Sequence, residues 1–311
     1  MGYPKVTVVG AGQVGAPAAE LLLLHDIADV VMIDVAEGLP QGKALDMMHM
    51  RSVERFGPTV AGTNSYADTS GSDVVVVTAG LPRKPGMTRD DLLAANRAIV
   101  ESVIAQVVAA SPDAIVICVT NPLDVMTYLA KNVSGLPVSR IFGMGGVLDS
   151  ARLAFAIAEK TGAAIGDVDA LAMGAHGDAM VPMPGHSTVA GKPLKELLSA
   201  DEIEALVERT VFGGAEVVGL LKTGSAFYAP AASVVSMVRA VVTDSGETLP
   251  TCAYLAGEYG IEDIYMSVPA RLGRTGVLEV VELPLSAEEL AALQLSASTV
   301  AEAVDSLGLR A

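Results

Sequence analysis

The sequence predicts an α/β protein with a doubly wound parallel sheet followed by a second, α+β domain. Up to about residue 145, short runs rich in valine and isoleucine alternate with helical stretches, as in sheets whose strands are linked by crossover helices. Beyond that point the pattern changes to longer helices and hairpin-like runs. The length of 311 residues also exceeds that of a usual single domain. We therefore expect one domain over residues 1–144 and another over residues 145–311.

The individual elements follow from the same periodicities. Apolar runs predict strands at residues 5–9, 30–33, 73–78 and 114–120, and helical periodicity predicts helices at residues 18–24 and 92–109. In the second domain we expect helices at residues 148–161, 201–221 and 286–307, with a hairpin around residues 187–193. Ligands of open α/β sheets bind at the carboxyl ends of the strands, so residues that follow the strands are the first candidates for a site.

The first strand leads into a glycine motif, Gly10-Ala11-Gly12-Gln13-Val14-Gly15. In dinucleotide-binding (Rossmann) units such glycines permit a tight turn, let a pyrophosphate approach the backbone, and allow the helix to pack on the strand. Glycine clusters also mark ordinary turns, but Asp34 ends the second strand about 20 residues further on, as in nucleotide sites. Its carboxylate would bind a ribose diol and repel a 2′-phosphate, which predicts NAD rather than NADP. The alternative is a solvated strand-end aspartate.

Composition narrows the class of protein. The formal net charge is −16 and no long basic run is present, which argues against nucleic-acid binding. No uninterrupted apolar segment approaches the roughly 20 residues that span a bilayer, and no cleavable signal pattern opens the sequence. Cys118 and Cys252 lie in apolar surroundings, and we expect both to be buried thiols. Together these features predict a soluble cytoplasmic protein with a small-molecule ligand.

Three arginines and one carboxylate suggest what that ligand is. Arg83 and Arg89 lie in a polar segment after the third strand, and Arg152 follows Asp149 by three positions in a predicted helix. Guanidinium groups grip carboxylates at two points, so three of them in one site would suit a dicarboxylate. The alternatives are a solvated basic loop and an ion pair between Asp149 and Arg152 on the surface of the helix.

His176, in Gly174-Ala175-His176-Gly177-Asp178, is a candidate for proton transfer, since an imidazole backed by a carboxylate exchanges protons near neutral pH. An isolated histidine is more often structural or exposed to solvent. A metal site from His176, Asp178 and His186 lacks an established ligand spacing. Asn121 follows a strand and could contact both cofactor and substrate, or could simply shape the turn before Pro122.

Taken together, the motifs resemble the lactate/malate dehydrogenase family along nearly the whole chain, and within it the lactate-dehydrogenase-like malate dehydrogenases of bacteria. The motifs are GAGQVG, Asp34, TAGLPRKPGMTR, NPLDVMTY, GVLDSAR, GAHGD and GSAFYAP. The resemblance implies that His176 donates and accepts the proton and that Asp149 is its partner. It also implies that Arg152 binds the carboxylate beside the reacting carbon, that Arg89 polarises the carbonyl group, and that Asn121 contacts the substrate oxygen.

The same resemblance implies an NAD site, no metal, and a homotetramer or homodimer. The residues expected to contact NAD are Gly10, Gly12, Gln13, Val14, Gly15, Asp34, Thr78, Ala79, Gly80, Asn96, Val119 and Asn121. Arg83 and Ala226 are similar to the residues of malate enzymes rather than lactate enzymes. Gly185-His186 and Ala154 depart from the family pattern, at positions that bear on subunit contacts more than on chemistry.

The resemblance therefore implies reversible oxidation of (S)-malate to oxaloacetate, by hydride transfer to NAD with a histidine/aspartate proton relay. Two alternatives remain. One is a dehydrogenase for lactate or another 2-hydroxy acid, and the other is an NAD-binding protein without catalysis, because a fold alone does not establish turnover.

Overall fold

The chain forms two compact units. The structure is a computed structural model that describes residues 2–81 and 89–310, and the side chains of residues 2–81 and 92–310. The first unit comprises Met1–Met144, Phe227–Glu247 and Leu272–Leu278, and the second comprises Gly145–Ala226, Thr248–Arg271 and Glu279–Ala311. The first unit thus includes residues 1–144, as in the predicted first domain, together with the two later segments Phe227–Glu247 and Leu272–Leu278.

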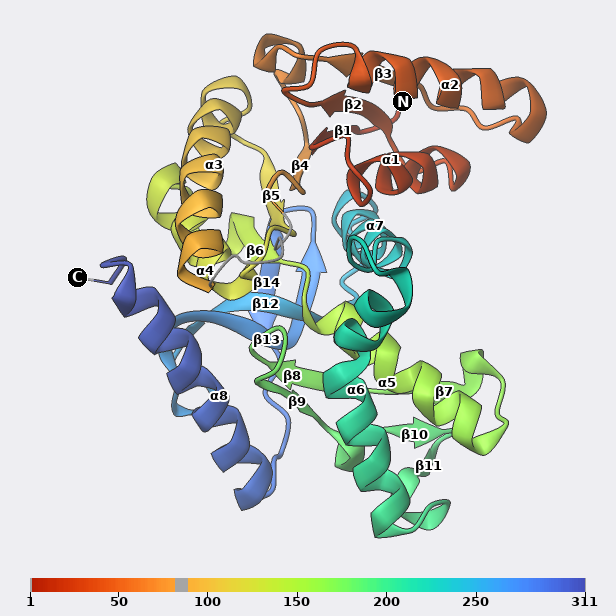
Figure 1. The fold of residues 1–311 in the computed structure, drawn as a ribbon, viewed down its shortest axis with the longest axis vertical. Coiled ribbons are helices and arrows are strands. Elements are labelled where there is room, and N and C mark those ends of the chain that lie inside the picture. Colours follow the sequence, from red (N-terminus) through yellow and green to blue (C-terminus); the bar gives the residue numbers. More distant parts are fainter. Residues whose placement is uncertain (1, 82–88, 311) are drawn as a thin grey trace. The chain divides into compact units, whose positions relative to one another are not determined.

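The first unit is built on a parallel sheet with the strand order β3-β2-β1-β4-β5-β6 (Figure 1). Its strands are β1 (Lys5–Val9), β2 (Asp29–Ile33), β3 (Val60–Thr63), β4 (Val74–Val77), β5 (Ile115–Cys118) and β6 (Ile141–Gly143). Val9 pairs with Ile33 on one side and with Val77 on the other, so the strands end at a common edge. The doubly wound parallel sheet predicted from the sequence is confirmed.

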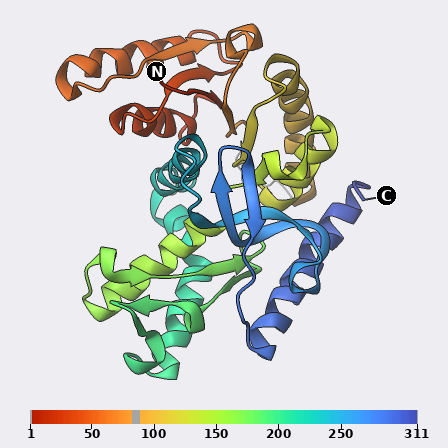
Figure 2. The same ribbon diagram turned by 180° about the vertical axis from the view of Figure 1, so that it is seen from behind.

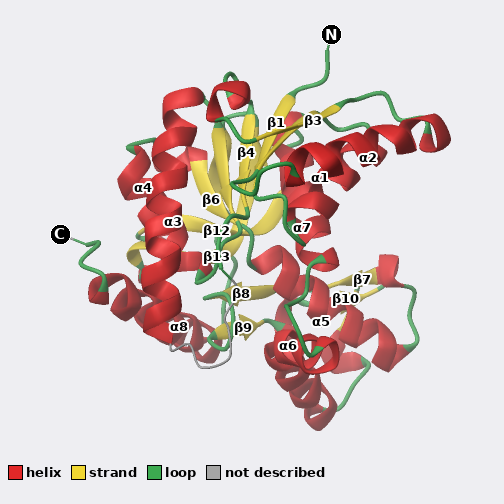
Figure 3. Cartoon of the chain, turned by 45° about the horizontal axis from the view of Figure 1, so that its top comes forward, coloured by secondary structure: helices red, strands yellow, loops and turns green. Residues whose placement is uncertain are grey.

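Helices cover this sheet on both faces, with α3 and α4 on one side and α1 and α7 on the other (Figure 3). The helices of the unit are α1 (Gly15–Leu24), α2 (Leu39–Glu54), α3 (Arg89–Ala110), α4 (Leu123–Ser134) and α7 (Tyr228–Val242). Burial on both faces explains why β4 and β5 are apolar throughout, with the sequences VVVV and IVIC.

The return of α7 to the first unit follows from its composition. Ala231, Val234 and Val238 are buried at helical spacing, and the helix packs against α1 and β4. An apolar stripe of this kind must be covered, and α1 supplies the covering surface. The sequence gives no local sign of this arrangement, because the partner helix lies about two hundred positions upstream.

Within the described residues, one helical segment, Leu92–Ala110 of α3, is long and apolar enough by length and composition to cross a membrane. Val100, Val103, Ile104 and Val107 are buried in the protein at the spacing of one helix face, and 28% of the apolar window is buried. The segment also carries an ion pair between Arg97 and Glu101 at 2.8 Å. The segment therefore has the pattern of a helix that buries one face in a protein core.

Both cysteines are buried, as expected from the sequence. Cys118 lies at the end of β5, and burial raises the pKa of its thiol to about 12. Because the thiolate is the reactive form, this side chain is chemically inert at neutral pH.

The second unit combines antiparallel strands with three helices (Figure 2). One sheet has the order β12-β13-β8-β9, and a smaller one has the order β11-β10-β7. The strands are β7 (Val168–Asp169), β8 (Ala172–Gly174), β9 (Met180–Pro182), β10 (Thr188–Val189), β11 (Lys192–Pro193), β12 (Thr248–Ala256) and β13 (Glu262–Gly273); β14 (Gly276–Val280) follows β13. The predicted hairpin near residues 187–193 is confirmed, since Thr188 pairs with Pro193.

The helices of this unit are α5 (Gly146–Thr161), α6 (Ala200–Leu221) and α8 (Ala287–Ser306), close to the predicted ranges. Capping boxes fix the starts of two of them. Ser199 and Glu202 bond reciprocally at the start of α6, as Ser286 and Glu289 do at the start of α8. Short 3₁₀ helices lie at Tyr66–Thr69, Val138–Arg140, Ile165–Asp167, Pro184–His186, Leu194–Glu196 and Glu258–Gly260.

The connection between β1 and α1 depends on two glycines. Gly10 adopts a φ of +104°, which side chains other than glycine rarely allow. A Cβ atom on Gly15 would lie 1.8 Å from the carbonyl oxygen of Gly10, so the helix can start this close to the strand only with glycine there. At Gly12, by contrast, a Cβ atom would meet nothing within 4 Å.

We predict opposite outcomes for alanine at these two neighbouring glycines. Gly15→Ala should lower the free energy of unfolding by about 1 to 3 kcal/mol or more, because the strand and helix must separate. Gly12→Ala is the matched control and should change it by less than about 1 kcal/mol. Thermal unfolding followed by circular dichroism measures both. Equal melting temperatures for the two variants would contradict the close packing of α1 on β1.

Candidate active site

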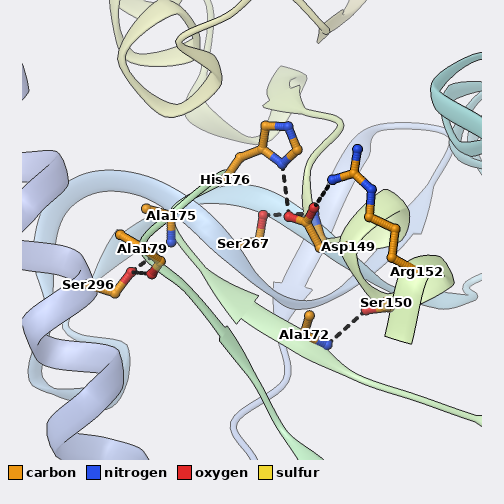
Figure 4. Close-up of polar contacts among 10 residues, drawn as sticks. Asp149, Ser150, Arg152, Ala172, Ala175, His176, Ala179, Ser267 and Ser296 are labelled. Atoms are coloured by element: carbon orange, nitrogen blue, oxygen red, sulfur yellow. Dashed lines mark hydrogen bonds and ion pairs between the residues drawn. The ribbon is translucent and has the colours of Figure 1, made fainter. Parts of the chain in front are cut away.

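Three side chains expected in the site come together in the second unit (Figure 4). Asp149 lies in the first turn of α5, and His176 lies two residues after the end of β8. The Nδ1 atom of His176 is 2.8 Å from Oδ2 of Asp149, and Nη1 of Arg152 donates to Oδ1 of the same carboxylate at 3.1 Å. One carboxylate therefore contacts both the imidazole and the guanidinium, as the spacing of Asp149 and Arg152 on one helix face permits.

Burial makes this arrangement more than a surface ion pair. The side chain of Asp149 is only 2% exposed, and those of His176 and Arg152 are 13% and 19% exposed. A buried carboxylate is tolerated when it is paired and hydrogen bonded, and here each oxygen has a partner. Its place in the first turn of α5 adds the favourable interaction of a negative charge with a helix N-terminus. The alternative of an exposed Asp149–Arg152 pair is therefore wrong.

The second ring nitrogen of His176 points away from Asp149 (Figure 4). With Nδ1 hydrogen bonded to a carboxylate, the tautomer of a neutral imidazole is fixed and Nε2 becomes the proton acceptor. The pair can thus take a proton at Nε2 and stabilise the resulting imidazolium through Asp149.

Two buried serines tie α5 to the sheet that carries His176. The Ser267 hydroxyl on β13 accepts the N–H of Gly146 at 2.9 Å, at the start of α5. The Ser150 hydroxyl on α5 accepts the N–H of Ala172 at 2.9 Å, at the start of β8. Sequence reasoning missed both, since Ser267 lies 121 positions from Gly146 and serine is common in every setting.

A third serine, Ser296 on α8, contacts the turn that holds His176 (Figure 4). Its hydroxyl accepts the N–H of Ala175 at 2.8 Å and donates to the carbonyl oxygen of Ala179 at 2.6 Å. Sequence analysis gave no reason to single out this residue either.

The stem of Arg152 runs beside two glycines of α6. Cβ atoms on Gly213 and Gly214 would lie 3.3 Å and 3.5 Å from its side chain. Two glycines inside a helix disfavour the helix by about 1 kcal/mol each, so the pair is a signal of close approach that sequence analysis could have used. A Cβ atom on Gly213 would press on the Cδ atom of Arg152, whereas one on Gly214 would make ordinary van der Waals contact with the guanidinium.

The first unit gathers the residues predicted to bind NAD at the carboxyl edge of its sheet. Asp34 follows β2, and its two oxygens accept the N–H groups of Ala11 at 2.7 Å and Ala36 at 2.9 Å. The carboxylate is thereby fixed next to the glycine motif. Burial, together with the nearby Asp34 charge, raises the pKa of Tyr66 to about 12, so this hydroxyl remains a donor at neutral pH.

The other strand ends are fastened to one another by side chains. The Thr78 hydroxyl donates to the carbonyl oxygen of Val9 at 3.0 Å, and the Thr120 hydroxyl donates to that of Ala79 at 2.7 Å. The Asn96 amide, 1% exposed, accepts the N–H of Leu81 at 2.8 Å and donates to the carbonyl oxygen of Asn121 at 2.7 Å. The Asn96 side chain therefore hydrogen-bonds to the backbone at the carboxyl edge of the sheet. Gly80 and Val119 also lie at this edge.

Lys43 on α2 is a cation at the glycine motif that sequence analysis missed. Its Nζ atom donates to the carbonyl oxygen of Ala11 at 2.7 Å. A single lysine within a polar helix gives no sequence signal of this contact.

The remaining candidates are placed as follows. Arg83 lies outside the described residues, as does the side chain of Arg89, whose backbone begins α3. Ala226 is half-buried and belongs to the chain segment that joins α6 to α7. Among the described residues no three His, Cys, Asp or Glu side chains form a group that could hold a metal ion, so the metal alternative gains no support. The Nε2 atom of His186 instead lies 3.6 Å from Oε2 of Glu289, at the start of α8.

The edge of the first unit has the features that a dinucleotide requires. A Cβ atom on Gly12 would meet only open space, which leaves the backbone accessible to a pyrophosphate. Within the described residues no side chain caps the N-terminus of α1, the kind of helix end that binds phosphates in dinucleotide-binding units. The fixed Asp34 carboxylate then suits a ribose diol.

Comparison with known proteins agrees with both halves of this description. The lactate/malate dehydrogenase NAD binding domain matches residues 4–143, and the lactate/malate dehydrogenase alpha/beta C-terminal domain matches residues 146–307. A malate dehydrogenase of Roseiflexus sp. (strain RS-1) is 48% identical over 304 residues, 98% of each chain.

Two solved structures have nearly the same fold. The malate dehydrogenase of Cryptosporidium parvum has a TM-score of 0.96 at 42% identity, over 98% of this chain and 99% of that chain. The lactate dehydrogenase of the same organism, complexed with lactic acid and the NAD cofactor, has a TM-score of 0.96 at 41% identity, over 100% of both chains. The chain belongs to the lactate/malate dehydrogenase family, and NAD is its cofactor.

Proposed function

We propose that the protein is an NAD-dependent malate dehydrogenase, which interconverts (S)-malate and oxaloacetate. The observation that carries the proposal is the buried contact between His176 and Asp149, with Arg152 on the same carboxylate. Nucleotide binding alone has no use for such a pair, which argues against a non-catalytic NAD-binding protein. Relatives named malate dehydrogenase are 48% and 52% identical to this chain, which supports malate as the substrate over other 2-hydroxy acids.

In malate oxidation His176 is the general base. Its Nε2 atom takes the hydroxyl proton of malate, while Nδ1 remains 2.8 Å from Asp149. NAD, held at the glycine motif and Asp34, would supply the acceptor for the hydride that leaves C2 of the substrate. Asp149 stabilises the imidazolium, and in the reverse direction His176 returns the proton to the carbonyl oxygen of oxaloacetate. General acid/base transfer of this kind accelerates a reaction by roughly 10² to 10⁴.

The arginines bind and polarise the substrate. Arg152 has five N–H donors in a planar fork, and its contact with Asp149 uses the Nη1 group, so other donors can bind the carboxylate next to C2. The packing of its stem beside Gly213 and Gly214 limits the directions it can take. Arg89 is assigned to the carbonyl oxygen and Asn121 to the substrate oxygen on family resemblance.

Arg83 is assigned to the distal carboxylate, which oxaloacetate has and pyruvate lacks, and Ala226 leaves room for it. The likeness in fold to a lactate dehydrogenase means that backbone geometry alone does not separate the two substrates. Side chains at a few positions decide the choice, and Arg83 is the one that adds a matching charge.

We further propose that the protein is a cytoplasmic homotetramer or homodimer that binds neither nucleic acid nor membranes. Two buried thiols suit a reducing compartment. The net charge of −16 disfavours polyanionic partners.

His176→Asn should leave NADH binding nearly intact and lower kcat for oxaloacetate reduction by about two to four decades, because the proton donor is lost. Fluorescence titration of NADH and steady-state kinetics measure the two quantities. His49→Asn, at an exposed position on α2, is the matched control and should behave as the unchanged protein. Near-normal turnover by His176→Asn would remove the histidine from the mechanism.

Arg83→Gln should lower kcat/KM for oxaloacetate by about one to two decades, since a charge-assisted contact contributes roughly 1.5 to 3 kcal/mol. Turnover of pyruvate should not fall, because pyruvate has no distal carboxylate. The decay of NADH absorbance with each keto acid measures both rates and, in the unchanged protein, tests the proposed activity itself.

Arg274→Gln, at an exposed position, is the control for loss of a positive charge. Parallel losses with both keto acids would show that Arg83 supports the site generally and does not select the substrate. Preference of the unchanged protein for pyruvate would overturn the malate assignment.

A further inference from the structure

A side chain from a helix distant in sequence bonds to both ends of the turn that carries His176. Ala175 follows β8 and Ala179 precedes β9, so the two residues flank the segment that contains His176. The Ser296 hydroxyl accepts the N–H of Ala175 at 2.8 Å and donates to the carbonyl oxygen of Ala179 at 2.6 Å. One hydroxyl thus satisfies a backbone donor and a backbone acceptor at the two ends of the turn.

Ser296 is well suited to hold this turn in place. Ser296 is 4% exposed, so water does not readily replace its hydrogen bonds. The helix that carries it is anchored by the Ser286–Glu289 capping box and by the buried Leu293 and Val300. The Gln294 amide also donates to the carbonyl oxygen of Tyr259 at 3.0 Å. The hydroxyl therefore projects from a support that is itself fixed.

The backbone around the hydroxyl is shaped to admit it. Gly174 adopts a φ of +87°, and a Cβ atom there would lie 2.7 Å from the Ser296 oxygen. Glycine at this position lets the end of β8 approach α8 closely. The two hydrogen bonds and the close approach of Gly174 all converge on one oxygen, and the three residues involved lie within three positions of His176.

We infer that Ser296 is a positioning residue for proton transfer, which holds the His176 turn so that its imidazole stays against Asp149. This inference rests on the proposed function of His176. The ring nitrogen meets the carboxylate at 2.8 Å, and α5, which carries Asp149, is fixed separately through Ser267. The pairing of Gly174 with Met180 and the bond from the Met180 N–H to the Gly177 carbonyl also restrain the turn, and Ser296 adds a restraint that joins its two ends to α8. A misplacement of 1 Å in an active site can cost about 10²-fold in rate.

Ser187 provides a matched control at the other end of the same strand pair. Its hydroxyl accepts the N–H of Leu171, just before β8, at 3.2 Å, and donates to the carbonyl oxygen of Met183, just after β9, at 2.9 Å. Ser187 is 0% exposed. The two serines therefore make the same kind of contact in similar burial, and only Ser296 does so beside His176.

The test compares Ser296→Ala, Ser187→Ala and the unchanged protein. Both variants should have lower melting temperatures, since Ser296→Ala removes the partners of the Ala175 N–H and the Ala179 carbonyl, and Ser187→Ala removes the partner of the Leu171 N–H. The Met183 carbonyl keeps the N–H of His186 as a donor in Ser187→Ala. Only Ser296→Ala should lower kcat for oxaloacetate reduction, by about 10-fold or more, with KM for oxaloacetate within about twofold. The primary deuterium isotope effect, measured with NADH deuterated at the transferred position, should also rise in that variant alone, because the chemical step becomes more limiting. Ser296→Thr, which keeps the hydroxyl, should recover most of the rate.

A second readout does not depend on turnover. Nuclear magnetic resonance of labelled histidines follows the titration of His176, whose signal is assigned by its loss in His176→Asn. A nearby carboxylate favours the charged imidazole, so a weaker contact with Asp149 should move this titration to lower pH in Ser296→Ala and not in Ser187→Ala.

The inference is overturned if Ser296→Ala keeps kcat within about twofold and an unchanged histidine titration, or if Ser187→Ala shows the same losses. Should Ser296→Ala fail to fold, Ser296→Cys takes its place, since a thiol is a weak hydrogen-bonding group of similar shape. Absence of oxaloacetate turnover in the unchanged protein would overturn the proposed function instead, and the histidine titration would still decide whether Ser296 maintains the His176–Asp149 contact.

Discussion

The second unit is organised around one buried negative charge, the carboxylate of Asp149. A charge that is 2% exposed is stable only when each oxygen has a partner, and this requirement places His176 on one side and Arg152 on the other. It also explains why α5 begins where it does, with the carboxylate in its first turn. Chemistry and stability therefore depend on the same contacts, so a change that weakens the relay also leaves a poorly paired charge in the core.

Much of the fold was predictable because it is encoded locally. Valine-rich runs predicted β1, β2, β4 and β5, and the glycine motif predicted the turn into α1. Serine and glutamate three positions apart mark the starts of α6 and α8. The register of β12 against β13 and the return of α7 to the first unit were not predictable, because both depend on contacts between segments distant in sequence.

The residues of the site also fall into a group that was predictable from the sequence and a group that was not. Gly12, Asp34, Asp149 and His176 belong to motifs in which spacing carries information, and the family match supports the interpretation of those motifs. Ser267 and Ser296 lie 117 to 121 positions from their partners, and no pattern distinguishes them from other serines. Sequence therefore identifies the groups that react more readily than the groups that hold them, since the supporting contacts are made by common residues through tertiary structure.

The close approach of Gly174 to Ser296 has a consequence for how this protein can vary. A Cβ atom at position 174 would lie 2.7 Å from the Ser296 oxygen and 3.1 Å from the Val181 side chain, at a φ of +87° that side chains other than glycine rarely adopt. A smaller residue at position 296 would therefore not make room for a side chain at position 174, and it would remove the bonds to Ala175 and Ala179. Only glycine at position 174 lets the Ser296 hydroxyl reach both ends of the turn, so designed libraries should keep Gly174 wherever they vary position 296.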